Sequence, residues 1–153
     1  MSAEKTLVLI KPDAMLKCLY GSVLYELSKL NLKMVGLKLV NVDSKLASEH
    51  YEEVLEKHGE EIFNKLIKHL TGEFHNNENV IAIVYKGENA IQRIRNLAGK
   101  THPDEADPNS IRGRYGKIHT KTNVFENVVH ASDSIESANK EISLWFKPEE
   151  LVE

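Results

Sequence analysis

Leu7-Val-Leu-Ile10, ended by Pro12, is the stretch that decides the fold. Consecutive apolar residues without a polar alternation are typical of a strand that other elements cover on both faces. Proline has no backbone N–H to donate, so the strand ends before residue 12. We therefore predict that this strand lies in the centre of a sheet.

The apolar pattern further along the chain alternates between helical and extended segments. The expected helices cover 23–30, 62–70, 91–97 and the segment after Ser134, and the expected further strands are 34–42, 80–85 and 128–129. A helix cap is expected at Asp43 or Ser44. This order predicts one α/β layer structure, and it leaves both a doubly wound and a split βαβ topology open.

The length and composition fit one soluble domain spanning residues 1–153. The chain is 41% hydrophobic and 28% charged, with a net charge of -3. Acidic residues offset the basic ones, which argues against a mainly electrostatic nucleic-acid binder. The single cysteine, Cys18, cannot form an intramolecular disulfide, and no apolar run suits a signal peptide or a membrane span. We therefore expect a cytoplasmic protein with no membrane partner.

All four arginines fall between positions 93 and 114, whereas the lysines are spread along the chain. A planar guanidinium offers paired donors that match phosphate or carboxylate oxygens, so the cluster indicates an anion site. Surface salt bridges are the alternative. Arg95 and Arg112 flank the loop from Gly99 to Ser110, and long loops of this kind are often functional.

Gly99-Lys100-Thr101 in this loop resembles the end of a Walker A motif. That motif needs a glycine five positions before Gly99, where this chain has Ile94. We therefore exclude a P-loop.

The segment Asn127-Val-Val-His-Ala-Ser-Asp-Ser134 leads from an apolar strand into a polar turn and a helix start. Backbone N–H groups at a helix start favour negative charge, and His130 there can act as a base, a nucleophile or a metal ligand. The six other histidines show no i,i+4 pair and no cysteine partner, which disfavours a metal site. A purely structural core or cap histidine is the alternative.

Glu141 borders the apolar stripe of the last expected helix. An ionised carboxylate near burial needs a partner, and His130 of the same unit can provide one. A carboxylate on one ring nitrogen fixes the tautomer and leaves the other nitrogen free as a nucleophile. The alternative is a solvated glutamate on the helix surface.

Several motifs follow one another along nearly the whole chain: Thr6-Leu-Val-Leu-Ile-Lys-Pro-Asp13, Gly21, His50-Tyr51, Ile111-Arg-Gly113, Asn127 to Ser134 and Lys140-Glu-Ile-Ser-Leu-Trp-Phe-Lys-Pro-Glu-Glu150. In this order they resemble the nucleoside diphosphate kinase family. The resemblance implies an α+β, ferredoxin-like split βαβ domain with a four-stranded antiparallel sheet covered by helices.

The resemblance also implies a ping-pong reaction. His130 would accept the γ-phosphoryl group of a nucleoside triphosphate, typically ATP, and pass it to a nucleoside diphosphate. By the same match Glu141 orients His130, Ser132 supplies a hydroxyl beside it, and Tyr51 lies at the phosphate end of the pocket. The implied nucleotide-binding residues are Lys11, Ile62, Arg95, Thr101, Arg112 and Asn127. Mg²⁺ held by the nucleotide phosphates, without a protein ligand, is the implied cofactor, and a hexamer or tetramer of the chain is the implied assembly.

The chain departs from the family pattern at several places. Ile62 stands where the family has a phenylalanine that stacks on the base, with Phe63 as the alternative alignment, and Ala131 replaces a glycine. Extra residues occur around 74–79 and between 116 and 126. The preferred base therefore stays open.

Two other functions compete with turnover. One is a nucleotide-binding or assembly module of the same fold with little turnover, against which the intact His130 and Glu141 argue. The other is a ferredoxin-like RNA-binding domain, but the chain lacks the aromatic-rich strands that such domains use for base stacking.

Overall fold

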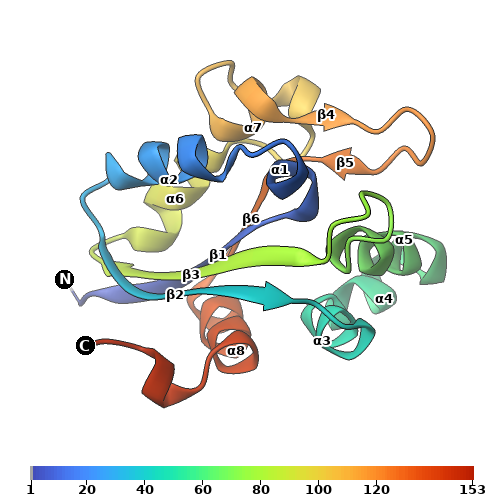
Figure 1. The fold of residues 1–153 in the computed structure, drawn as a ribbon. Coiled ribbons are helices and arrows are strands. Elements are labelled where there is room, and N and C mark those ends of the chain that lie inside the picture. Colours follow the sequence, from blue (N-terminus) through green and yellow to red (C-terminus); the bar gives the residue numbers. More distant parts are fainter. Residues whose placement is uncertain (1) are drawn as a thin grey trace.

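The computed structural model describes residues 2–153 and has a four-stranded antiparallel sheet at its centre (Figure 1). The strand order is β2 (Lys33–Asn41), β3 (Asn79–Gly87), β1 (Glu4–Ile10) and β6 (Val129–Ala131). This is the order of the split βαβ, ferredoxin-like fold, so the predicted α+β class is confirmed and the doubly wound topology is excluded. β1 lies between β3 and β6, as its apolar run predicts.

β1 is covered on both faces because successive side chains of a strand point to opposite sides. Val8 and Ile10 pack with α2 (Tyr20–Ser28) and α6 (Ala90–Ala98), whereas Leu7 and Leu9 pack with α8 (Ile135–Trp145). All four side chains are fully buried. Figure 1 shows α2 and α6 on one side of the sheet and α8 on the other.

Three helices gather at one end of the sheet: α3 (Ser44–His50), α4 (Glu52–His58) and α5 (Glu60–Leu70). Asp43 caps α3, because its carboxylate accepts the backbone N–H of Leu46 at 2.8 Å. Of the two expected caps, Asp43 is therefore the right one. The sequence pattern misses α4 because this helix buries no residue and so carries no apolar stripe.

The other unpredicted elements are too short to show a periodicity. They are α1 (Pro12–Leu16), α7 (Ile111–Tyr115), a 3₁₀ turn at Pro103–Glu105 and another at Pro148–Glu150, and a hairpin of β4 (Lys117–Ile118) with β5 (Phe125–Glu126). The two segments expected from the sequence to carry extra residues, around 74–79 and between 116 and 126, lie in the turn that precedes β3 and in this hairpin. Within residues 2–153 no helix has both the length and the hydropathy of a membrane-spanning segment.

Candidate active site

Most of the residues expected from the sequence line one cavity of about 360 Å³. Its walls come from distant parts of the chain: the end of β1, the helices from α3 to α7, and β6 with α8. Of the ten expected site residues, the eight that line the cavity are Lys11, Tyr51, Arg95, Thr101, Arg112, Asn127, His130 and Glu141. The fold therefore brings basic, acidic and imidazole groups to one place.

His130 and Glu141 form a hydrogen-bonded pair in the cavity wall. β6 carries His130 opposite Leu9 of β1, and Glu141 projects from the buried face of α8. Nε2 of His130 lies 2.5 Å from Oε1 and 3.2 Å from Oε2 of Glu141. When Nε2–H donates to an ionised Glu141, Nδ1 of the neutral imidazole keeps its lone pair. Within residues 2–153 this Nδ1 has no hydrogen-bond partner, so it is available as a nucleophile.

His50 packs beside His130, although the sequence pattern assigns it no role. The ring centroids are 4.4 Å apart and the ring planes are nearly perpendicular. The indole N–H of Trp145 donates to Nδ1 of His50 at 3.1 Å. Burial, followed by repulsion from His130 and Lys11 when His50 is protonated, holds the pKa of His50 well below its usual value, so His50 is neutral. Because Nδ1 accepts the Trp145 N–H, the proton of His50 sits on Nε2.

This tautomer bears on whether the cavity can hold a metal ion. In the described part of the chain, one group brings three potential ligands within 4.8 Å of one another, namely His50, His130 and Glu141. A ligating histidine presents a bare nitrogen and donates its other N–H to an acceptor, whereas Trp145 offers His50 a donor. The set is also richer in nitrogen than Mg²⁺ prefers. It is therefore unsuited to a resident metal ion.

Lys11 and Asn127 form a buried polar pair at the carboxyl end of β1. Nζ of Lys11 donates to Oδ1 of Asn127 at 2.7 Å, and Nδ2 of Asn127 donates to the carbonyl of Thr101 at 3.0 Å. Burial lowers the pKa of Lys11 to about 8, although the charge of Asp13 opposes this shift. An anionic ligand would stabilise the charged form of Lys11.

The arginine cluster divides in two. Arg112 is buried, and its guanidinium donates to three backbone carbonyls, those of Gly99, Asn127 and Val129. Arg95 is exposed at the cavity wall. Arg93 and Arg114 instead bond groups outside the cavity. The interpretation as an anion site therefore fits Arg95 and Arg112 alone, and Arg112 also braces the backbone.

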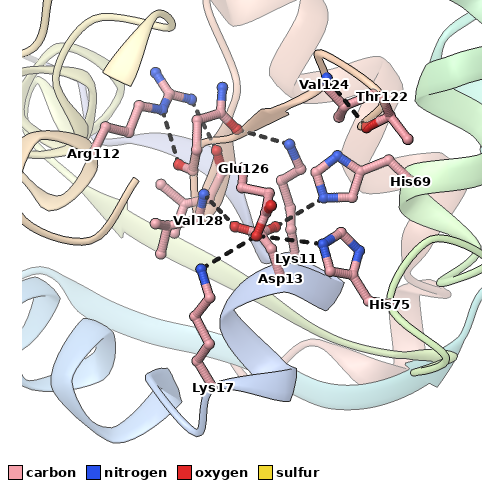
Figure 2. Close-up of polar contacts among 12 residues, drawn as sticks. Lys11, Asp13, Lys17, His69, His75, Arg112, Thr122, Val124, Glu126 and Val128 are labelled. Atoms are coloured by element: carbon pink, nitrogen blue, oxygen red, sulfur yellow. Dashed lines mark hydrogen bonds and ion pairs between the residues drawn. The ribbon is translucent and has the colours of Figure 1, made fainter. Parts of the chain in front are cut away.

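Asp13 lies next to this site in a buried network of polar side chains (Figure 2). Nε2 of His69 donates to Oδ1 of Asp13 at 2.9 Å. Burial acts to raise the pKa of Asp13, but the bond from His69 and the charge of Lys11 outweigh it and bring the pKa to about 2. Burial lowers the pKa of His69 to about 4. The pair is therefore an ionised carboxylate with a neutral imidazole.

Ser132 and Ile62 lie outside the cavity lining. Ser132 is fully buried, and its hydroxyl accepts the backbone N–H of Leu7 at 3.1 Å, which fastens the end of β6 to β1. Ile62 is 46% exposed and precedes Leu66, a residue of the cavity wall, by four positions on α5. Residues four apart share a helix face, so Ile62 extends the wall outward.

The chain is similar to known proteins along almost its whole length. The sequence model of the family described as nucleoside diphosphate kinase matches residues 4–151. The nucleoside diphosphate kinases of Pyrococcus horikoshii and Staphylococcus haemolyticus are each 44% identical to it, over 98% and 97% of this chain and 89% and 91% of their own. A solved nucleoside-diphosphate kinase from Borrelia burgdorferi, a transition state mimic with bound vanadate and ADP, has a TM-score of 0.90 at 34% identity and covers 99% of this chain and 91% of its own. The Aquifex aeolicus nucleoside diphosphate kinase has a TM-score of 0.85 at 34% identity, over 99% and 100%.

The buried Asp13–His69 pair predicts how stability depends on pH. The folded pKa of His69, about 4, lies below the ordinary value of 6.5, so its contribution is present above pH 6.5 and is lost as the pH falls toward 4. The His69→Gln variant keeps a donor for Asp13 without titrating in this range. We expect wild-type protein to lose on the order of 1–2 kcal/mol more unfolding free energy between pH 7 and pH 5 than this variant.

Urea unfolding at both pH values measures this difference. His58→Gln, which removes an exposed histidine of α4, is the matched control and should keep the wild-type pH dependence. Equal pH dependence in wild type and His69→Gln would contradict a neutral buried His69.

Proposed function

The chain belongs to the nucleoside diphosphate kinase family and is a phosphotransferase, and on this premise we propose that it transfers the γ-phosphoryl group of a nucleoside triphosphate to a nucleoside diphosphate through a phosphohistidine at His130. The observation that carries this proposal is the His130–Glu141 pair. It occupies one ring nitrogen, Nε2, and leaves the other, Nδ1, at a cavity whose wall includes Lys11, Arg95 and Arg112.

The proposed transfer has two half-reactions. In the first, the Nδ1 lone pair attacks the γ-phosphorus, the Nδ1–P bond forms, and the bridging P–O bond breaks to release the nucleoside diphosphate. The positive charge on the imidazole is then stabilised by Glu141 through Nε2–H. In the second, an oxygen of another nucleoside diphosphate attacks the phosphohistidine, the Nδ1–P bond breaks, and His130 returns to its neutral form.

The cations of the cavity suit the charge of a triphosphate. Phosphoryl transfer depends mainly on positioning and on neutralising oxygen charge. Lys11, Arg95 and Arg112, with the hydroxyls of Tyr51 and Thr101, would hold the phosphates, and Asn127 would hold Lys11 in place. Mg²⁺ arriving on the nucleotide would neutralise further phosphate charge, and the residues of the wall suit this arrangement because their donor set does not favour a resident ion.

The apolar part of the cavity wall is where we expect the nucleotide base to bind. Val54 and Leu66 line the cavity, and Ile62 continues the same face of α5 toward solvent. We place the base against this surface, with Ile62 at its outer edge. An apolar wall covers either a purine or a pyrimidine, because it reads no base edge.

We also propose that residues 1–153 act as one domain in the cytoplasm. Its partners are nucleotides, and it binds neither nucleic acid nor membrane. Ser132 holds the register of β6 beside His130.

We propose that the chain forms a homo-oligomer, a hexamer or a tetramer. The observation in favour is that the edge strand β2 carries exposed apolar side chains, namely Met34, Leu37 and Leu39.

Incubation with γ-labelled ATP should give a phosphoenzyme that survives base and is lost in acid, as expected for a phosphorylated imidazole. His130→Gln should remove this label, and the control His58→Gln should retain it. Labelling of His130→Gln at the wild-type level would exclude His130 as the acceptor.

Arg95→Ala should lower kcat/KM at least tenfold, which corresponds to about 1.4 kcal/mol of transition-state stabilisation. Arg95 is exposed at the cavity wall, so its loss removes a phosphate contact without leaving a buried group unpaired. Arg93→Ala, on the same helix but outside the cavity, should stay within twofold in steady-state assays. An unchanged kcat/KM in Arg95→Ala would leave Arg95 as a surface residue only.

Glu141→Gln should slow phosphorylation of His130 at least tenfold, while nucleotide dissociation constants stay within a few-fold. The amide keeps the shape of Glu141 but loses the charge that stabilises the imidazolium. Single-turnover rates and calorimetry separate the two quantities, with Glu136→Gln, an exposed glutamate of the same helix, as control. If binding weakens as much as the rate, Glu141 acts on the nucleotide and not on His130.

A further inference from the structure

The turn before His130 has a backbone conformation that valine rarely adopts. Val128 has a φ of 73°, and the N–H of Val129 donates to the carbonyl of Asn127 at 2.7 Å. Residues 127–129 therefore form a γ-turn whose central residue has a positive φ, a kind that is rarer than the inverse γ-turn. A branched Cβ makes positive φ costly, and such strain persists only where the surrounding contacts enforce it. Because the turn joins Asn127 to the strand of His130, whatever enforces it also places both residues.

Asp13 holds this turn from the junction of β1 and α1. Its Oδ2 accepts the backbone N–H of Val128 at 3.0 Å, while the backbone N–H of Lys11 donates to the carbonyl of Val128 at 2.9 Å. Asp13 is 1% exposed and ionised, and a hydrogen bond to a charged acceptor is stronger than one between neutral groups. Both polar groups of the strained residue are therefore fixed.

His69 holds the other oxygen of the carboxylate. Its Nε2–H donates to Oδ1 of Asp13 from α5, and the imidazole is fully buried. Figure 2 shows the Asp13 carboxylate between His69 and Val128. With both oxygens occupied, the carboxylate cannot rotate away from the turn without leaving a buried donor unpaired.

We propose that Asp13 is a positioning residue for the phosphoryl transfer, supported by His69: its carboxylate holds the Val128 turn and thereby places His130 and Asn127 at the cavity. The inference rests on the proposed function of His130. Asp13 is not part of the cavity wall, so it acts through the turn and not on the nucleotide. The competing view is that Asp13 serves stability alone.

Asp13 also acts on Lys11 through its charge. The charged and titratable groups that act on Lys11 are Asp13 of α1, Arg112 of α7 and Glu126 of β5, and Lys11 in turn lowers the pKa of His50 and His69. Among the contributions that raise the pKa of Lys11 against its burial, that of Asp13 comes first. Replacing Asp13 by asparagine removes this charge but keeps an acceptor for Val128. The amide NH2 then faces His69, which can accept at Nε2 by moving its proton to the unpaired Nδ1, so the two effects separate.

Three variants test the proposal in single-turnover phosphorylation by γ-labelled ATP, at a temperature where circular dichroism shows all of them folded. Asp13→Asn should stay within about threefold of wild type at pH 6, below the range where Lys11 titrates, and Asp13→Ala should be at least tenfold slower. Asp13→Ala combined with Val128→Gly should regain at least threefold over Asp13→Ala, because glycine adopts positive φ without strain.

Two further readouts are insensitive to a loss of stability. The proton NMR resonance of His130 Nε2–H, assigned by its absence in His130→Gln, should persist in Asp13→Asn and shift or broaden in Asp13→Ala, where His130 moves relative to Glu141. In Asp13→Asn the alkaline limb of kcat/KM should move to lower pH, because Lys11 loses its proton more easily. Glu136→Gln is the control for both readouts.

A rate and an Nε2–H resonance of Asp13→Ala equal to those of wild type would overturn the proposal, as would a double variant no faster than Asp13→Ala. The NMR readout needs no turnover. If wild-type protein formed no phosphohistidine, the proposed function would fail, and the resonance would still decide whether Asp13 places His130.

Discussion

The pairing of β1 with β6 sets the geometry of the candidate active site. β1 is buried on both faces, so a slip of one residue would exchange the two sets of side chains that fill its two cores. β6 pairs with it over three residues and places His130 opposite Leu9, while the backbone of Lys11, just after β1, bonds that of Val128. The proposed nucleophile and a buried cation therefore belong to one hydrogen-bonded ladder. Their separation is set by the hydrophobic core and not by flexible loops.

Positive charge is buried around the cavity at a cost in desolvation, and under the proposed function this charge favours bound phosphate. Desolvation by burial lowers the pKa of Lys11 to about 8 and that of Arg112 to about 10. Water therefore solvates the charged forms of both side chains poorly. Backbone carbonyls and Asn127 satisfy their N–H groups, and Asp13 and Glu126 offset the burial of Lys11 only in part. Under the proposed function, a phosphate in the cavity supplies further opposite charge, in surroundings where each contact is stronger than in water. In the proposed reaction, the cations that are most costly to bury in the free protein are therefore those that would contribute most to binding a triphosphate.

Sequence patterns predict the parts of this structure that depend on burial. They fail where residues close in sequence have side chains that point to different surroundings. The apolar run at Leu7–Ile10 correctly predicts a central strand, since burial on both faces leaves no polar alternation. The arginine cluster in the sequence assigns all four arginines to an anion site, but Arg93 and Arg95 lie two positions apart on α6 and only Arg95 lines the cavity. Most site residues follow only from the family resemblance. No sequence pattern predicts the γ-turn at Val128, because valine is among the residues that least often adopt a positive φ.

The turn before β3 and the β4–β5 hairpin meet beside the same buried network (Figure 2). His75, from the turn before β3, places Nε2 3.5 Å from Oε1 of Glu126, and Lys17 donates to the same oxygen at 3.2 Å. His119, from the β4–β5 hairpin, packs its ring 6.0 Å from that of His75. His75 and His119 thus bring the turn before β3 and the β4–β5 hairpin together beside the buried carboxyl group of Glu126. Because Glu126 directly precedes Asn127, both segments pack next to the strained turn at Val128 and the cavity wall.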